Sequence, residues 1–192
     1  MAEVKNILLV GVGGQGTILA SKILSIGLVG AGYDVKMSEV HGMAQRGGSV
    51  TTQVRYGEKV FSPIIGLGEA DILVAFEAME ALRWLEYLKP EGKAVVNDYR
   101  IASVPILMGK KDYPEGVMEK VAEKVDTTVL NAAQIAETLG NMKTMNIVLL
   151  GALIKAMGLG TINWENVIRE NVKATLADIN IKALHAGMEA IK

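Results

Sequence analysis

The residue types best suited to chemistry gather in one stretch, SEVHGMAQRGGSV, at positions 38–50. Ordering such a glycine-rich segment is costly, because glycine loses more backbone freedom on folding than any other residue. Loops of this kind usually bring the backbone close to a ligand or partner and direct a few polar side chains at it. We therefore predict three catalytic residues in this loop, namely Arg46, Gln45 and His41.

Each of these side chains offers a different chemistry. The guanidinium of Arg46 can bind a carboxylate or a phosphate through two hydrogen bonds. The amide of Gln45 can orient a polar group, and the imidazole of His41 can donate, accept or titrate near neutral pH. A structural interpretation stays open, in which Arg46 pairs with Glu39 or caps the carboxyl end of a helix. The other histidine, His185, is interpreted as a surface or packing residue.

A second motif, GVGGQG at positions 11–16, matches G-x-G-x-x-G between an apolar run and a helical pattern. This is the context of a dinucleotide-binding turn, in which the N–H groups of a helix terminus approach a pyrophosphate. Glu39 is the candidate for binding a ribose. A tight turn without ligand is the alternative, favoured by the long Gln15 amide, which we expect to point from the turn. The predicted cofactor-binding residues are Gly11, Val12, Gly13, Gly14, Gln15, Gly16, Gly47 and Gly48.

Hydrophobic periodicity predicts the elements that position both loops. Strands are expected at 6–10, 33–40, 49–56, 71–76, 93–97 and 127–130, with a hairpin turn at 56–59 leading into Val60 and Phe61 and another turn at 90–92. Helices are expected from residue 14, over 79–88, from residue 117, and from 132 to the end with breaks at 140–141, 158–160 and 178–180. The expected fold is an α/β, three-layer Rossmann-like domain over residues 1–192. Its sheet is mostly parallel, with a β-hairpin insert and a helical C-terminal third.

Composition excludes several classes of protein. The chain has 192 residues, half of them apolar, a net charge of −1 and no cysteine. The charge gives no reason to expect nucleic acid as a partner. Without cysteine the chain has no disulfide, no thiolate nucleophile and no thiolate ligand for zinc or an iron–sulfur cluster, and we predict no metal site. No signal peptide and no membrane-spanning stretch is evident, so we expect a cytoplasmic protein.

Asn146 stands out in the long apolar helix pattern that follows position 145. Asparagine is a poor helix former and needs a hydrogen-bonding partner if it is buried. Two interpretations stay open: a bond to a facing loop or subunit, or a solvated position near the start of the helix.

Taken together, the motifs at 11–16 and 39–48, and the segments 131–137, 140–141 and 146–151, resemble the gamma-type domain of 2-oxoacid:ferredoxin oxidoreductases. The sequence of residues 39–48 and the length of the chain are most similar to the beta subunit of the indolepyruvate type. The resemblance covers nearly the whole chain, and the combined motifs are far more specific than the glycine turn alone.

The resemblance implies a subunit of an enzyme that oxidatively decarboxylates 2-oxoacids, in particular aryl pyruvates, in anaerobic archaea and bacteria. The products are acyl-CoA, carbon dioxide and reduced ferredoxin. It also implies that thiamine diphosphate and the iron–sulfur clusters are carried by a large alpha subunit, which the absence of cysteine here fits. Coenzyme A binds in the complex, and the chain is not expected to be active alone.

Two other functions remain as alternatives. One is a free-standing oxidoreductase that binds NAD(P) or a flavin at residues 11–16, and the other is a scaffold subunit whose glycine loops only pack against a partner. The high apolar content favours an obligate partner. The isolated chain is then expected to cover that surface by self-association, for example as a homodimer.

Overall fold

The structure is a computed structural model that describes residues 4–41 and 47–191. A six-stranded sheet with the order β2-β3-β1-β4-β5-β6 forms its centre. Strand β3 is antiparallel to both of its neighbours, whereas the β1–β4, β4–β5 and β5–β6 pairs are parallel. The strands are β1 (Lys5–Val12), β2 (Asp34–His41), β3 (Ser49–Gly57), β4 (Ala70–Ala75), β5 (Leu88–Asn97) and β6 (Asp126–Leu130).

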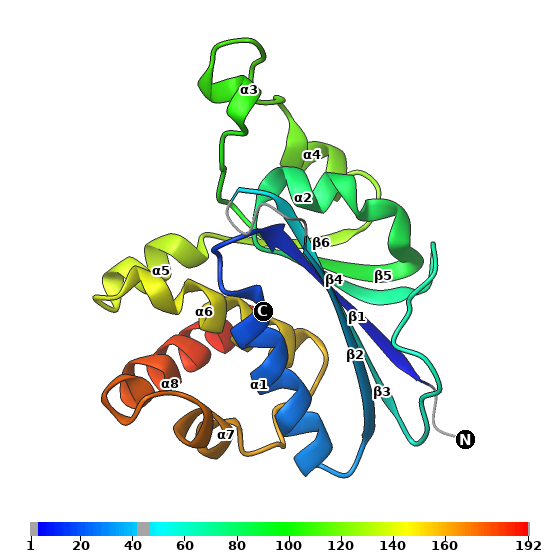
Figure 1. Cartoon of the computed structure of the whole chain (residues 1–192), viewed down its shortest axis with the longest axis vertical. Helices are drawn as coiled ribbons and strands as arrows, with labels where there is room; N and C mark the ends of the chain where they lie inside the picture. The colour runs from blue at the N-terminus through cyan, green and yellow to red at the C-terminus, as the bar shows by residue number, and fades with distance from the viewer. Residues whose placement is uncertain (1–3, 42–46, 192) are drawn as a thin grey trace.

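Helices cover both faces of this sheet, which confirms the predicted three-layer α/β fold (Figure 1). One face carries α1, α5, α6, α7 and α8, and the other carries α2 and α4, while α3 stands away from the body. The helices are α1 (Thr17–Gly30), α2 (Ala78–Arg83), α3 (Val104–Leu107), α4 (Val117–Ala122), α5 (Ala132–Thr138), α6 (Met145–Ala156), α7 (Trp164–Asn171) and α8 (Ala174–Glu189), with 3-10 turns η1 (Leu85–Tyr87) and η2 (Met142–Thr144).

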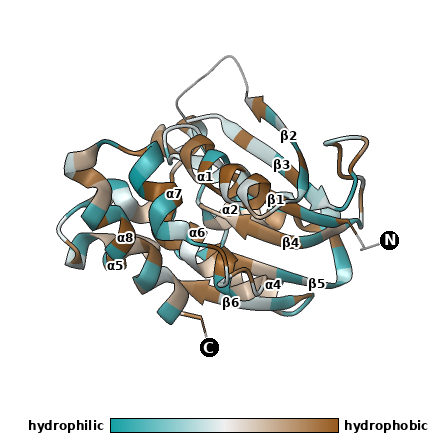
Figure 2. Cartoon of the chain, turned by 90° about the horizontal axis from the view of Figure 1, so that it is seen from below, coloured by the Kyte–Doolittle hydropathy of each residue, from teal (hydrophilic) through white to brown (hydrophobic). Residues whose placement is uncertain are grey.

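The side chains of β1 point alternately to the two faces of the sheet and so contribute to two hydrophobic cores. Ile7 and Leu9 pack into the larger core with the helices of the α1 face, and Leu8 and Val10 pack into the smaller core with α2 and α4. A strand that is buried on both faces needs a continuous apolar run, because successive side chains point to opposite faces. Figure 2 shows the same feature for β4, which is hydrophobic along most of its length.

The predicted hairpin at 56–59 is wrong. Strand β3 ends at Gly57, and the hairpin is instead formed by β2 and β3, which are paired from end to end. The backbone after Gly57 is bound by side chains rather than by another strand: the N–H of Val60 donates to Asp34 Oδ2 (2.8 Å), and Arg55 donates to the carbonyls of Ser62 and Ile64.

Three smaller predictions also need correction. The helix expected over 79–88 ends at Arg83, and the turn expected at 90–92 lies within β5. There the register shifts, so that Leu88 lies opposite Ala70 while Lys93 lies opposite Ile72. The break expected at 178–180 is absent, since α8 runs through it, whereas the breaks at 140–141 and 158–160 are confirmed.

Candidate functional site

The two glycine segments meet at the carboxyl end of β1. The N–H of Gly13 donates to the carbonyl of Gly48 (2.8 Å), and the N–H of Gly47 donates to the carbonyl of Gly13 (3.3 Å). Because β3 is antiparallel to β1, its first residues lie beside the last residues of β1, where Val12 is opposite Ser49. The fold therefore brings together described residues of both predicted motifs at one edge of the sheet.

Gln15 turns inward and holds the first glycine segment in shape. Its Oε1 accepts from the N–H of Val12 (2.8 Å), and its Nε2 donates to the carbonyl of Phe76 (2.8 Å) at the end of β4. A Cβ at Gly11 would lie 2.9 Å from Gln15 Oε1, so glycine is needed there to admit the amide. The expectation that this amide points away from the turn is wrong: both of its ends are used within the fold.

The amino end of α1 opens toward the same edge. The helix begins after Gly16, whose φ of 80° is left-handed, and no described side chain caps it. Gly14 has φ 104°, and no described atom lies within 4 Å of the place where its Cβ would be. The first N–H groups of a helix have no partner inside the helix and favour an anion. This turn therefore has the chemistry of a phosphate or carboxylate site.

Helix topology places that turn at the switch point of the sheet. Helices α1 and α2 follow β1 and β4 but lie on opposite faces, so the chain diverges between the carboxyl ends of these two strands. Ligands of open α/β sheets bind in such a crevice.

Asn146 supports the turn from α6. Its Nδ2 donates to the carbonyl of Gly16 (3.0 Å), which bears out the bond to a facing loop as one of its two interpretations. The side chain is buried, and its Oδ1 finds no partner within the described ranges. A Cβ at Gly16 would lie 2.7 Å from this amide, so the turn and the helix approach each other closely.

The predicted catalytic residues are only partly placed. Gln45 and Arg46 lie outside the described residues, and their roles stay predictions. His41 ends β2, where its Cα pairs with that of Val50. The proposed ribose acid, Glu39, accepts a hydrogen bond from the hydroxyl of Ser21 in α1 (3.1 Å). His185 lies half-exposed on the surface, 2.8 Å from Glu165 Oε1, as expected for a surface residue.

Two buried carboxylates at the start of α2 were not predicted. Glu77 accepts from the N–H of Ile101 (3.1 Å) and from the hydroxyl of Tyr113, and Glu80 accepts from the hydroxyl of Ser49. Burial raises the pKa of the Tyr113 hydroxyl, and the bond to Glu77 raises it further. In the sequence, Glu77 comes just after a buried strand and Glu80 lies in the first turn of the next helix, positions that many solvated carboxylates share.

Ser49 follows the second glycine segment, so the bond to Glu80 fixes the exit of that segment against α2. Glu80 also accepts from Arg83 Nε (3.1 Å) and from Trp84 Nε1 (3.3 Å).

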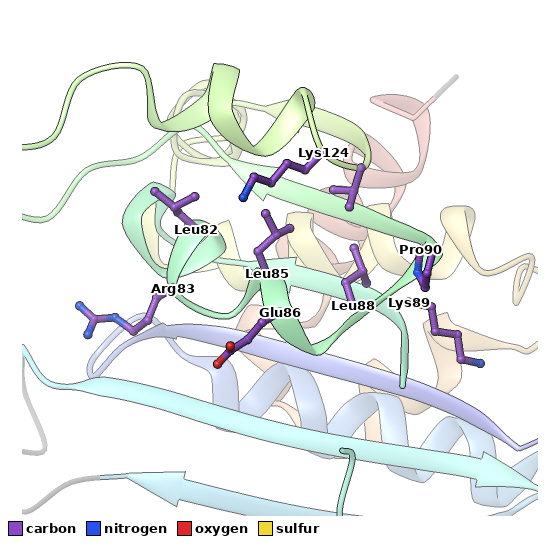
Figure 3. Close-up of a pocket in the computed structure, with 9 residues that line it drawn as sticks. Leu82, Arg83, Leu85, Glu86, Leu88, Lys89, Pro90 and Lys124 are labelled. Atoms are coloured by element: carbon purple, nitrogen blue, oxygen red, sulfur yellow. The ribbon is translucent and has the colours of Figure 1, made fainter. Parts of the chain in front are cut away.

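Two cavities of the described residues are lined by parts of the chain other than the glycine turn. One, of about 370 Å³, lies between α2, η1, the start of β5 and the residues between α4 and β6. The side chains of Leu82, Leu85 and Leu88 line it (Figure 3). Another, of about 460 Å³, lies between α1, η2 and the junction of α7 with α8. The described ranges hold no cluster of three or more acids and histidines suited to a metal ion. No helix among them has the length and apolar character needed to cross a membrane.

Comparison with known proteins adds the family. The model of the pyruvate ferredoxin/flavodoxin oxidoreductase family matches residues 6–190. The chain belongs to this family. A subunit of indolepyruvate oxidoreductase from Pyrococcus horikoshii is 39% identical over 97% of this chain and 96% of its own length. The gamma subunit common to the pyruvate and ketoisovalerate oxidoreductases of Pyrococcus abyssi is 30% identical over 93% of this chain and 92% of its own length.

One solved structure with this fold belongs to a longer chain. The 2-oxoglutarate:ferredoxin oxidoreductase of Magnetococcus marinus, solved with 2-oxoglutarate, coenzyme A and succinyl-CoA, matches with a TM-score of 0.73 and 19% identity. The match covers 98% of this chain but 31% of that one, so the fold there is one part of a longer polypeptide.

The resemblance seen in the sequence is therefore confirmed. Because the chain matches individual subunits over nearly their whole length, it is a small subunit of a multi-subunit oxidoreductase of this family.

Proposed function

We propose that this chain is the small subunit of an indolepyruvate-type 2-oxoacid:ferredoxin oxidoreductase. The complex would oxidatively decarboxylate aryl pyruvates to acyl-CoA and carbon dioxide and pass the electrons to ferredoxin. The observation that carries the proposal is the 39% identity with an indolepyruvate oxidoreductase subunit along nearly the whole chain, against 30% with a gamma subunit of the pyruvate and ketoisovalerate type. The chain would act as one gamma-type catalytic domain spanning residues 1–192, in the cytoplasm.

The redox cofactors belong elsewhere in this complex. Iron–sulfur clusters are held by cysteine thiolates, and this chain has no cysteine, so its donor set does not fit a cluster. Thiamine diphosphate is bound through a divalent cation, and no described cluster of acids or histidines suits one. We therefore assign both groups to a large alpha subunit, with ferredoxin reached through that subunit.

This chain would complete the active site of its partner with the glycine turn at 11–16 and the segment 41–48. The open amino end of α1 and the space beside Gly14 suit a phosphate of coenzyme A or a substrate carboxylate. Arg46 would bind the same anion, with Gln45 and His41 orienting it. Val12, Gln15 and the remaining glycines of both segments would shape the backbone around it.

The test is activity in the assembled pair. The chain is co-expressed with the large subunit of the same organism, purified through a tag on this chain, and assayed for coenzyme A-dependent reduction of a dye with indolepyruvate. We expect turnover by the pair and none by this chain alone, with pyruvate and 2-oxoglutarate as control substrates. A stable pair that is inactive with every 2-oxoacid would favour the scaffold function instead.

A dinucleotide-binding function would give a different pattern. The chain alone would then bind NADH, seen as a change in NADH fluorescence, and would not capture the large subunit. The inward Gln15 amide counts against it, because the amide occupies space between the carboxyl ends of β1 and β4, where a dinucleotide would lie.

A further inference from the structure

An arm projects from the carboxyl edge of the sheet between β5 and α4 (residues 98–116), with α3 near its tip (Figure 1). Helix α3 has no buried residue. Val104, Leu107 and Met108 are 67%, 74% and 61% exposed, so the tip presents three large apolar side chains to water. An isolated helix of this length is not stable by propensity alone, so another contact must favour this conformation.

Both ends of the arm are fixed to one buried carboxylate. Oε1 of Glu77, which is 1% exposed, accepts from the N–H of Ile101 near the entry of the arm and from the hydroxyl of Tyr113 near its exit. The same hydroxyl accepts from the N–H of Met79 (3.1 Å), and the guanidinium of Arg100 lies 5.3 Å from the ring centre of Tyr113. A buried carboxylate is costly unless it is hydrogen-bonded. These hydrogen bonds of Glu77 to Ile101 and Tyr113, here called the clasp, therefore define where the arm leaves the body.

The base of the arm is continuous with the glycine turn. Glu77 follows Phe76, whose carbonyl accepts from the Gln15 amide and from Asn97 Nδ2 (3.0 Å). Asn97 is the last residue of β5, directly before the arm. A partner that reaches the carboxyl edge to share the active site would therefore meet the arm as well.

The tip also carries charge. Lys110 and Lys111 follow α3, both are exposed, and no carboxylate in the described part of the chain pairs with either. With Asp112, which comes next, residues 104–112 carry two positive charges and one negative charge. A protruding apolar surface with lysines beside it is complementary to an apolar groove that is bordered by acidic residues.

We propose that this arm inserts α3 into an apolar, acid-rimmed groove on the large subunit of the same complex. The identity of the partner rests on the proposed function. Three side chains fall far short of the roughly 800 Å² that each partner contributes to a stable interface, so the tip anchors a wider contact rather than forming a dimer by itself. In the Magnetococcus marinus protein the match covers 31% of the chain, so most of that polypeptide lies outside this fold.

The first test replaces Leu107 by serine and measures the Kd for the purified large subunit. Leu67→Ser is the matched control: Leu67 is 62% exposed and lies in the β3–β4 segment, where the carbonyl of Glu69 accepts from Asn6 Nδ2 at the amino end of β1. We expect Leu107→Ser to raise the Kd about tenfold or more and Leu67→Ser to change it less than about twofold. Equal Kd values for wild type and Leu107→Ser would overturn the inference and leave the proposed function standing.

Two other outcomes would also overturn it. If the wild-type chain does not bind the large subunit at all, the arm has no such partner, and the proposed function fails with it. If Leu107→Ser alters the sedimentation of the isolated chain but not binding to the large subunit, the tip serves contact between copies of this chain.

The clasp has a test of its own. Tyr113→Phe removes the hydroxyl from Glu77 and is compared with Tyr33→Phe, whose ring packs against Tyr56 near the amino end of β1. We expect faster hydrogen exchange across residues 101–113 and a Kd for the large subunit raised several-fold, because the arm is less preorganised. Exchange as slow as in the wild type would show that the clasp does not hold the arm.

Discussion

Gln15 shows how one side chain can shape a turn without touching a ligand. Its amide binds the N–H of Val12 and the carbonyl of Phe76. In Gln15→Leu the N–H of Val12 loses this partner, whereas the carbonyl of Phe76 keeps the bond from Asn97 Nδ2. An unmet buried group costs about 1–3 kcal/mol, so we expect a loss of about 1–3 kcal/mol in the free energy of unfolding. Urea denaturation measures it. Gln134→Leu, at an exposed position of α5, should stay within about 0.5 kcal/mol of the wild type.

A tyrosine provides a residue-scale prediction on pH. Burial raises the pKa of Tyr56 to about 12 from an ordinary value of 10.0. The folded state thus holds this proton more tightly than the unfolded chain. The resulting stability is fully present below pH 10 and is lost as the pH rises through the folded pKa of about 12. We expect Tyr56→Phe to flatten the fall in melting temperature over this window, and an unchanged fall would show that other groups cause it.

At the scale of elements, α6 and α8 form the most extensive helix–helix contact of the described residues, and two glycines permit it. A Cβ at Gly187 would lie 1.9 Å from the carbonyl of Val148, and a Cβ at Gly151 would lie 2.0 Å from that of Leu184. We expect Gly187→Ala to push the helices apart and to cost about 1–3 kcal/mol or more, as other overpacked core substitutions do. Thermal unfolding followed by circular dichroism measures the loss.

The matched control lies in another helix. At Gly30, the last residue of α1, no described atom lies within 4 Å of an added Cβ. Gly30→Ala should therefore stabilise the protein by about 0.4–1 kcal/mol, because it reduces the freedom of the unfolded chain. Equal effects of the two substitutions would mean that the α6–α8 contact does not depend on glycine.

Helices and strands were predictable where a local apolar pattern determines them. They were missed where side chains distant in the sequence determine the path of the backbone. Strand β1 and the breaks near residues 140 and 158 follow from periodicity and glycine. The false hairpin at 56–59 arose because Gly57 has the sequence of a turn, whereas Asp34 and Arg55 bind the backbone beyond it. In the candidate site, the meeting of the two glycine segments depends on β3 lying beside β1. The role of Glu77 depends on Ile101 and Tyr113, more than twenty residues away.

At the scale of the whole molecule, the exposed apolar side chains include the tip of the arm, Val40 on the edge strand β2, and Phe61 after β3. Single exposed apolar side chains are normal on monomeric proteins, but the tip brings three of them together, as at a protein–protein contact. A partner that covers both the tip of the arm and Val40 would have to be large, as in a multi-subunit oxidoreductase. Alone in solution, the chain is then expected to cover part of this surface with another copy of itself.

Sedimentation velocity tests this expectation. The isolated chain, of 20.5 kDa, should increase in average mass as its concentration rises from about 1 to 100 μM, since association follows mass action. Addition of the large subunit should replace the self-associated species by the mixed complex, because the two partners compete for the same apolar surface. The melting temperature of this chain should rise with the concentration of the large subunit for the same reason. A monomer throughout that range would mean that the exposed side chains are tolerated in water and that only the large subunit binds them.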